Sequence, residues 1–424
     1  MRIVVLGGYG LIGAACLRAL RAAGHHVVGV GRDRHAPRPT GPGIDWAFAD
    51  LARIPTSRMR DLLAGADVVV NAAGALQDGP GDDLQAIHAR LPATLADALT
   101  GTGTRVVQIS AVGATLDAST AFLRSKAQGD RALLAADVDA AILRPGLVLA
   151  SQAWGGTALL RAAAALPVGL RLPWDAPLHT VWIEDVTRWV VDAAAGRVAP
   201  GTVVDLAEPE GRDLTRTIAA MRDWLGLPPP KVTVPVPAWT LAAVGRAADA
   251  MSWLGWRPPL RRTALRVLAD GVRADPARHH RTRILAETLA AMPATAQDRV
   301  FARGWPLVPV CVATLSAFWL LSGLIGAWRH DAATAVLTAR GVGSGAAEAA
   351  VWAGVAIDLV LGAAVTVRRW CRPACLGMVA VGLGYLAAAT GLAPDLWADP
   401  LGPLVKVLPA TVLALVTAAL VGGR

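Results

Sequence analysis

The sequence predicts an α/β fold class: a doubly wound parallel sheet with a small α+β lobe, followed by a four-helix transmembrane bundle. Three observations support this prediction. Over residues 1–150, short β-branched runs alternate with alanine- and leucine-rich stretches of helical period, which is typical of a parallel sheet covered by helices. Residues 151–300 keep a globular composition but a less regular pattern. From about residue 305 onward, long apolar runs fill the chain.

The expected strands of the sheet follow the β-branched runs. They cover Arg2–Leu6, His26–Val30, Asp67–Asn71, Arg105–Ser110 and Ala140–Arg144. A helix is expected to begin near Leu11 and to end at Gly24, because glycine favours the position just after a helix. We therefore divide the chain into a sheet domain (1–150), a lobe and juxtamembrane region partly interleaved with it (151–300), and a membrane domain (301–424).

Four apolar runs predict membrane-spanning helices. They cover approximately Pro306–Trp328, Ala347–Val367, Ala374–Leu392 and Pro403–Val421. Each approaches the ~20 residues that a helix needs to cross a ~30 Å hydrocarbon layer. Most flanking arginines fall on the side of both termini, which the positive-inside rule assigns to the cytoplasm. The N-terminal apolar run is too short for a signal peptide. We expect a multi-pass protein of a bacterial-type inner (cytoplasmic) membrane, with both termini and the sheet domain in the cytoplasm.

The formal net charge of +9 comes almost entirely from arginine, since the sequence has only three lysines. No basic stripe interleaves with aromatic residues, so nucleic-acid binding is not expected. Clusters over Arg257–Arg262 and Arg278–Arg283 precede the membrane segments, which favours contact with anionic lipid headgroups; a merely solvated surface is the alternative. The four scattered cysteines fit neither a disulfide framework nor a zinc site, and no metal is expected.

A glycine-rich turn follows the first expected strand. It reads Gly7-Gly8-Tyr9-Gly10-Leu11-Ile12-Gly13 and opens the first expected helix. A strand, a glycine turn and a helix N-terminus together form an anion site, because backbone N–H groups and the helix dipole face a phosphate and glycine lets the backbone approach it. The sequence therefore predicts a nucleotide-binding site here.

The spacing Gly7-x-x-Gly10-x-x-Gly13 resembles that of the extended and atypical short-chain dehydrogenase/reductases, a Rossmann-fold family, and further motif matches cover about 150 residues. The resemblance implies that NAD(P) is bound by Gly7, Gly10, Leu11, Ile12, Gly13, Asp50, Leu51, Asn71, Ala72, Gly74, Lys126 and Pro145. Arg32 and Arg34 follow the second strand, where an arginine binds a ribose 2′-phosphate and an acidic residue binds a free hydroxyl. This favours NADP(H), although Asp33 between them keeps NAD(H) possible.

The chain departs from this family at the catalytic tyrosine. The family carries Tyr-x-x-x-Lys on one helix face after the fifth strand, but this sequence has Phe122 four residues before Lys126. The resemblance implies that Ser110 orients a substrate and that Lys126 holds the nicotinamide ribose. Phenylalanine transfers no proton, and general acid–base catalysis contributes about 10²–10⁴-fold, so conventional carbonyl reduction is expected to be impaired. His179 is either a substitute acid or a structural residue.

The membrane domain resembles the DoxX-like four-helix domain in helix number and general character. Asp358 lies near the middle of the second expected span. An ionisable group there is costly unless it faces the bundle interior, which makes Asp358 a functional candidate. A structural hydrogen-bonding role and a role in proton transfer or quinone binding both stay open. Lys406 stands near a helix end and is expected to extend toward the membrane interface.

Two functions agree with these features. The first is an oxidoreductase that passes hydride to or from a lipid-soluble substrate, such as a quinone or an isoprenoid carbonyl, with water or Asp358 supplying protons. The second is a non-catalytic nucleotide-binding assembly or sensor protein, similar to the complex I accessory subunit that holds a nicotinamide dinucleotide for structural reasons. Phe122 favours the second function, and the intact cofactor motifs favour the first. The substrate, oligomeric state and protein partners do not follow from the sequence.

Overall fold

A computed structural model describes residues 1–79 and 83–421 of the chain. The chain forms two compact units. Unit 1 comprises Met1–Ala250 and Pro258–Ala302, and unit 2 comprises Met251–Arg257 and Arg303–Arg424. Each unit is described by itself.

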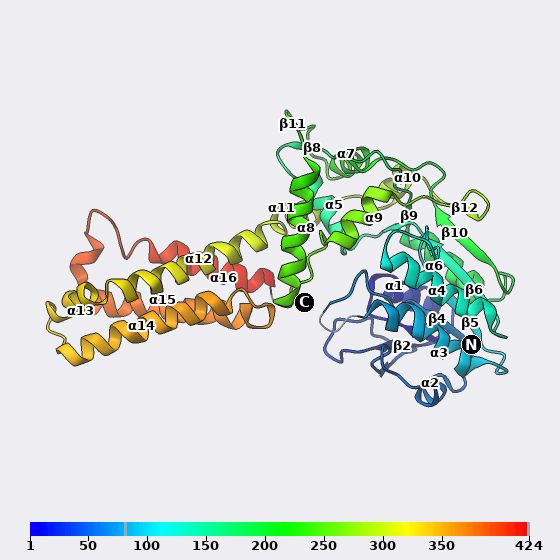
Figure 1. Cartoon of the computed structure of the whole chain (residues 1–424), viewed down its shortest axis with the longest axis horizontal. Coiled ribbons are helices and arrows are strands. Elements are labelled where there is room, and N and C mark those ends of the chain that lie inside the picture. Colours follow the sequence, from blue (N-terminus) through cyan, green and yellow to red (C-terminus); the bar gives the residue numbers. More distant parts are fainter. Residues whose placement is uncertain (80–82, 422–424) are drawn as a thin grey trace. The chain divides into compact units, whose positions relative to one another are not determined.

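Unit 1 is built on a parallel sheet of eight strands in the order β12-β10-β6-β5-β4-β1-β2-β3 (Figure 1). The strands are β1 (Arg2–Leu6), β2 (His26–Gly31), β3 (Ile44–Phe48), β4 (Val68–Asn71), β5 (Arg105–Ile109), β6 (Ala140–Pro145), β10 (Val203–Ala207) and β12 (His279–Arg281). All five predicted strands are present, which confirms the predicted parallel sheet. The strand order reverses at β1 and β4, and ligands of such sheets bind where the strands end beside this point.

Helices cover both faces of the sheet. One face carries α1 (Leu11–Ala22) and α6 (Ile183–Ala194), and the other carries α2 (Thr56–Leu63), α3 (Leu91–Leu99) and α4 (Ala121–Ala135). Side chains of β1 alternate between the two cores: Ile3 and Val5 pack with α1 and α6, while Val4 and Leu6 pack with α2 and α3. A π-helical turn, η1 (Ala86–Arg90), leads directly into α3.

The rest of unit 1 forms a smaller lobe with its own apolar core. Two small parallel sheets pair β7 (Leu147–Leu149) with β9 (Thr180–Trp182) and β8 (Gly169–Arg171) with β11 (Thr233–Pro235). The helices of this region are α5 (Gly156–Ala164), α7 (Leu214–Trp224), α8 (Ala238–Trp253), α9 (Arg262–Asp270), α10 (Leu285–Ala291) and α11 (Ala296–Gly304). The last turn of α8 and the end of α11 pass into unit 2.

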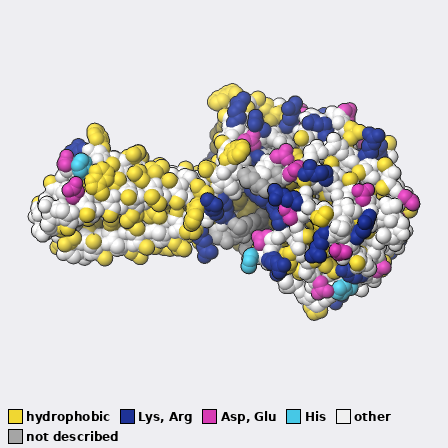
Figure 2. Space-filling model, turned by 60° about the horizontal axis from the view of Figure 1, so that its bottom comes forward, with side chains coloured by type: hydrophobic (Ala, Val, Ile, Leu, Met, Phe, Trp, Pro, Cys, Tyr) yellow, Lys and Arg dark blue, Asp and Glu magenta, His cyan; other side chains and the backbone are white. Residues whose placement is uncertain are grey.

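Unit 2 is helical, with α12 (Leu307–Trp328), α13 (His330–Thr338), α14 (Ser344–Ala364), α15 (Arg368–Leu392), a 3₁₀ turn η2 (Pro394–Trp397) and α16 (Val407–Val421). Among the described residues, three helices, those ending at Trp328, Ala364 and Leu392, are long and apolar enough to cross a membrane. Figure 2 shows hydrophobic side chains over much of this unit, with charged ones gathered near its ends on the face shown. The unit is therefore a membrane domain.

The fourth predicted span is shorter than expected. Helix α16 has 15 residues, which corresponds to about 22 Å against the ~30 Å of a hydrocarbon layer. The predicted span included residues 403–406, but these form turns, and Gly402 before them has a φ of +57°. The apolar composition alone therefore overestimated the length of this helix.

Reporter fusions test whether α16 crosses the membrane. Fusions after Arg340 and Asp399 should report the outside, and fusions after Arg369 and at the C-terminus should report the cytoplasm, because arginines flank the spans on that side. A C-terminal fusion that reports the same side as Asp399 would show that α16 does not cross. A cytoplasmic signal at Arg340 would contradict the topology as a whole.

Candidate nucleotide-binding and catalytic site

The glycine turn after β1 is closed by contacts that only glycine permits. Gly7 has a φ of +74°, and a Cβ there would lie 2.8 Å from the Ala72 backbone oxygen. A Cβ at Gly13 would lie 2.2 Å from the Gly7 backbone oxygen. The Gly10 N–H donates to the same Gly7 oxygen over 2.9 Å. These contacts bring the turn, the loop after β4 and the start of α1 together.

The N-terminus of α1 is suited to an anion. Leu11, Ile12 and Gly13 form its first residues, and the described structure shows neither a capping side-chain hydrogen bond nor an acidic residue in the first turn. The first N–H groups of a helix have no partner within the helix, and the helix dipole favours negative charge there. The pyrophosphate of a dinucleotide fits this donor set, with glycine rather than a side chain facing it.

The end of β2 carries the residues expected near the adenosine ribose. Arg32 and Arg34 are both exposed, and the Arg32 N–H donates to the Tyr9 hydroxyl oxygen over 3.1 Å. The Arg34 guanidinium lies 5.0 Å from the Phe48 ring centroid. Arg38, which the sequence analysis missed, also lies over the Phe48 ring, at 5.2 Å.

Two acidic residues near this edge of the sheet accept hydrogen bonds from backbone N–H groups. The Asp33 carboxylate accepts the His35 N–H over 2.8 Å, and the Asp50 carboxylate accepts the Ala52 N–H over 3.2 Å. Leu51, beside Asp50, is buried. Asp33 therefore stabilises the turn after β2. One of its carboxylate oxygens is thus already bonded to the backbone, whereas NAD(H) binding would need this carboxylate to accept the ribose hydroxyl groups.

The loop after β4 is shaped by Asn71. This residue is fully buried, its amide N–H₂ donates to the Gln108 side chain over 2.8 Å, and its side-chain oxygen accepts the Ala73 N–H over 3.3 Å. The Asn71 side chain is thus engaged on both sides and holds the turn through Ala72 to Gly74. A Cβ at Gly74 would lie 3.5 Å from Lys126 Nζ, so this loop runs beside the lysine.

Lys126 is buried at the centre of the candidate site. Its Nζ donates to the Ile109 backbone oxygen at the end of β5 over 2.9 Å. Burial lowers the pKa of Lys126 to about 8, and the nearby Asp130 carboxylate opposes this shift. The ammonium form therefore prevails at neutral pH. Phe122 lies one turn earlier on the same helix, α4.

His88 is a further residue of the site that the sequence analysis missed. Its ring lies edge-on to Phe122 with the centroids 5.5 Å apart. Nε2 accepts the Ala75 N–H over 3.1 Å, which leaves the proton on Nδ1, 3.0 Å from the Ser125 hydroxyl. Burial, and then the charge of Lys126, lower the pKa of His88 to about 2. The imidazole is thus neutral, and nothing in the sequence around it distinguished it from a packing residue.

Ser110 is engaged with a buried ion pair. Its hydroxyl donates to Asp130 over 2.8 Å, and the Arg144 guanidinium donates to the same carboxylate oxygen over 2.9 and 3.1 Å. Burial raises the pKa of Asp130, and the charge of Arg144 opposes the shift. Because the Ser110 hydroxyl donates its hydrogen to Asp130, it has no second hydrogen to donate to a substrate carbonyl. Pro145, the last residue of β6, follows Arg144 directly.

His179 has structural partners. Its Nδ1 accepts the Ala274 N–H over 3.3 Å, and its ring lies 6.2 Å from that of His279. Burial lowers the pKa of His179, with the charges of His279 and Arg273 adding to the shift and Glu208 opposing it. A neutral ring that accepts a backbone N–H packs the lobe and is poorly prepared to donate a proton.

Asp358 lies inside the helical unit, on α14. Its carboxylate accepts the Ser322 hydroxyl of α12 over 2.6 Å, and the Tyr385 hydroxyl of α15 lies 3.5 Å from its other oxygen. Only 7% of Asp358 is exposed, as expected for an ionisable group that faces a bundle interior. The contacts of Asp358 with Ser322 and Tyr385 thus connect α14 to α12 and α15.

Comparisons with known proteins agree with this geometry. Residues 3–150 match the NAD dependent epimerase/dehydratase family, and residues 316–415 match the DoxX-like family. The ceramide reductase of Caulobacter vibrioides (strain NA1000 / CB15N) is 25% identical over 256 residues, which are 59% of this chain and 78% of that protein.

Solved structures share the fold of unit 1. The Bordetella bronchiseptica enzyme WbmG in complex with NAD and UDP has a TM-score of 0.52 at 18% identity, over 69% of this chain and 93% of that one. The enzyme WbmH of the same organism, in complex with NAD+, has a TM-score of 0.51 at 17% identity, over 68% and 96%. At these identities the likeness concerns the fold alone. This membrane protein thus joins a nicotinamide-dinucleotide-binding Rossmann domain of the NAD-dependent epimerase/dehydratase family to a domain of the DoxX-like family.

Proposed function

We propose that this protein is a membrane-anchored, NADPH-dependent reductase of a carbonyl group on a lipid-soluble molecule, such as a quinone, an isoprenoid or another long-chain lipid. The observation that carries the proposal is the buried Lys126 ammonium, held by Ile109 beside Gly74 at the carboxyl ends of the strands. A membrane domain in the same chain favours a lipid substrate. The name of its relative, a ceramide reductase, agrees with that class.

Lys126 is the side chain best placed to replace the missing phenol. A bound, reduced dinucleotide supplies the hydride. Lys126 has three N–H groups, and within the described residues one of them is donated, to Ile109. We assign the other two to the nicotinamide ribose and to the substrate oxygen. The ammonium gives its proton to the oxygen as the carbonyl carbon gains hydride, and water returns the proton. A pKa of about 8 suits such an acid near neutral pH.

One set of observations favours the second candidate function, a non-catalytic nucleotide-binding protein. Phe122 carries no proton, and the Ser110 hydroxyl is engaged with Asp130. His88, the imidazole beside Phe122, is neutral. A protein that keeps only the cofactor site would show these same features, so the two candidates differ in whether Lys126 acts on a substrate.

Arg32 and Arg34 are expected to select NADPH over NADH. Exchanging both for alanine should reduce the preference at least tenfold, because each charge-assisted contact with a 2′-phosphate contributes about 1.5–3 kcal/mol. Titration of both dinucleotides against the parent and the variant measures this ratio. The double variant Arg58→Ala/Arg216→Ala removes the same charge from exposed helix positions and should leave the ratio unchanged. An unchanged ratio in the first variant would show that these arginines do not read the 2′-phosphate.

Restoring the phenol tests whether the rest of the site is intact. Phe122→Tyr places a hydroxyl one turn before Lys126, whose charge would lower the phenol pKa, and reductase activity should rise at least tenfold, or by about 1.4 kcal/mol of barrier. Oxidation of NADPH by quinones and long-chain carbonyls measures it.

Phe301→Tyr is the matched control for this prediction and should leave the rate unchanged, as should NADPH affinity in both variants. If the parent already reduces a substrate and Phe122→Tyr slows it, then Phe122 belongs to a different working site and the non-catalytic function is excluded.

A further inference from the structure

Helix α8 buries only a narrow stripe. Gly245, Ala248 and Ser252 are its buried residues, spaced three and four apart on one side. This side packs on α9: a Cβ at Gly245 would lie 3.0 Å from the Leu265 side chain. Asp249, the helix's single acidic residue, lies toward the same side, where Arg261 donates to it over 3.2 Å and Arg262 also bonds to it.

The opposite side of α8 is apolar and exposed. Trp239, Ala243, Ala247 and Ala250 lie along it, at spacings of three and four, and all are exposed. Trp239 is 71% exposed, and Trp253 at the helix end is 85% exposed. Upstream of α8, Val234 in strand β11 is 43% exposed, and Val232, just before that strand, is 58% exposed. An exposed apolar helix side with a tryptophan at each end of the helix indicates an interaction site.

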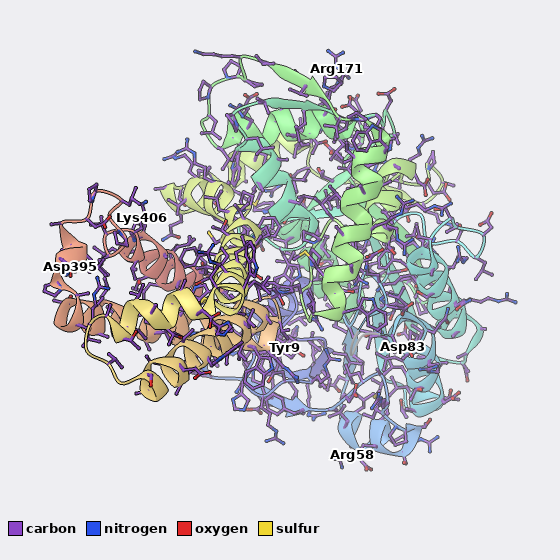
Figure 3. The ribbon with its side chains drawn as sticks, turned by 60° about the vertical axis from the view of Figure 1, so that its left-hand side comes forward. Tyr9, Arg58, Asp83, Arg171, Asp395 and Lys406 are labelled. Carbon is purple, nitrogen blue, oxygen red and sulfur yellow. The ribbon has the colours of Figure 1, made fainter. Side chains whose placement is uncertain are left out.

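The charges around this apolar surface are positive. Lys231 precedes β11, and Arg246 lies on the exposed side of α8. Strand β8, which pairs with β11, ends at Arg171; Figure 3 labels this residue at the outer edge of the small sheet. Asp249, the acidic residue of α8, is neutralised on the far side by arginines. The apolar side chains therefore suit an apolar phase, and the basic residues beside them suit anionic groups at the boundary of that phase.

The residues that follow α8 belong to unit 2 and pack on its helices. Within unit 2, the Arg368 N–H donates to the Leu254 oxygen over 2.9 Å, and the Trp256 indole N–H donates to the Thr366 oxygen over 2.6 Å. The Arg368 guanidinium lies 5.4 Å from the Trp256 ring centroid. These contacts place residues 254–256 at the turn between α14 and α15, where the spanning helices reach the membrane boundary.

We infer that α8 and β11 form an interfacial segment, with the apolar side of α8 in the headgroup layer of an anionic lipid bilayer. Tryptophan at both ends and arginine beside an apolar helix face are typical of segments that lie in this layer. The inference rests on the membrane anchoring in the proposed function but not on catalysis.

Spin-label accessibility of the full chain tests this inference. In a Cys311→Ala background, whose remaining cysteines are buried, labels are attached at Ala243→Cys and Ala247→Cys on the exposed side of α8. The protein is reconstituted into discs of phosphatidylethanolamine and phosphatidylglycerol. The matched control is Ser57→Cys, an exposed position of α2. The ratio of oxygen to nickel-chelate accessibility should be several-fold higher at residues 243 and 247 than at 57, because oxygen concentrates in lipid and the chelate in water.

Two results would overturn the inference. Equal ratios at all three positions would show that α8 lies in water. Dipolar broadening at residue 243 that disappears on dilution with unlabelled protein would show that a second copy covers it. Dinucleotide binding confirms that each variant is folded. Oxidation of NADPH by lipid carbonyls, measured separately, reports on the proposed reduction, so either idea can fail without the other.

Discussion

The close approach of α4 to the π-helical turn η1 positions most of the candidate site. A Cβ at Gly129 would lie 1.9 Å from the His88 backbone oxygen and 2.8 Å from the Pro92 side chain, so only glycine fits at this crossing. Glycine inside a helix costs about 0.5–1 kcal/mol relative to alanine, which the packing of α4 against η1 and α3 must offset. This contact brings α4 close to η1, and so brings Phe122 to the His88 ring.

Three residues on that face, spaced by one helical turn, each meet a different part of unit 1. Phe122 contacts the His88 ring, Lys126 bonds to the end of β5, and Asp130 binds Ser110 and Arg144. The pKa values follow from these surroundings: burial, and then the Lys126 charge, lower the pKa of His88, while the Asp130 carboxylate opposes the lowering of the Lys126 pKa by burial. A loosened α4 would therefore change the chemistry of the site together with its packing.

Features carried by contiguous residues could be predicted from the sequence, and features that depend on tertiary contacts could not. The strand over Arg2–Leu6 and the turn from Gly7 to Gly13 rest on local patterns, and both are present. His88 joins the site because α4 crosses η1, and Asp130 joins it because α4 packs beside Ser110 and Arg144; no local pattern indicates either contact. The exposed side of α8 was equally hidden, because an alanine-rich helix does not reveal which of its sides is packed. The roles of Phe122 and Lys126 stay predictions.

The pH dependence of hydride transfer tests the role of Lys126 most directly. If the Lys126 ammonium is the acid, kcat/KM for NADPH-dependent reduction should be level at neutral pH and fall about tenfold per pH unit above roughly pH 8, since only the protonated form donates. Lys126→Arg keeps the charge but does not release its proton in this range, so the variant should bind NADPH and lose the reaction. A rate that stays level through about pH 10, or a Lys126→Arg variant as active as the parent, would contradict the account.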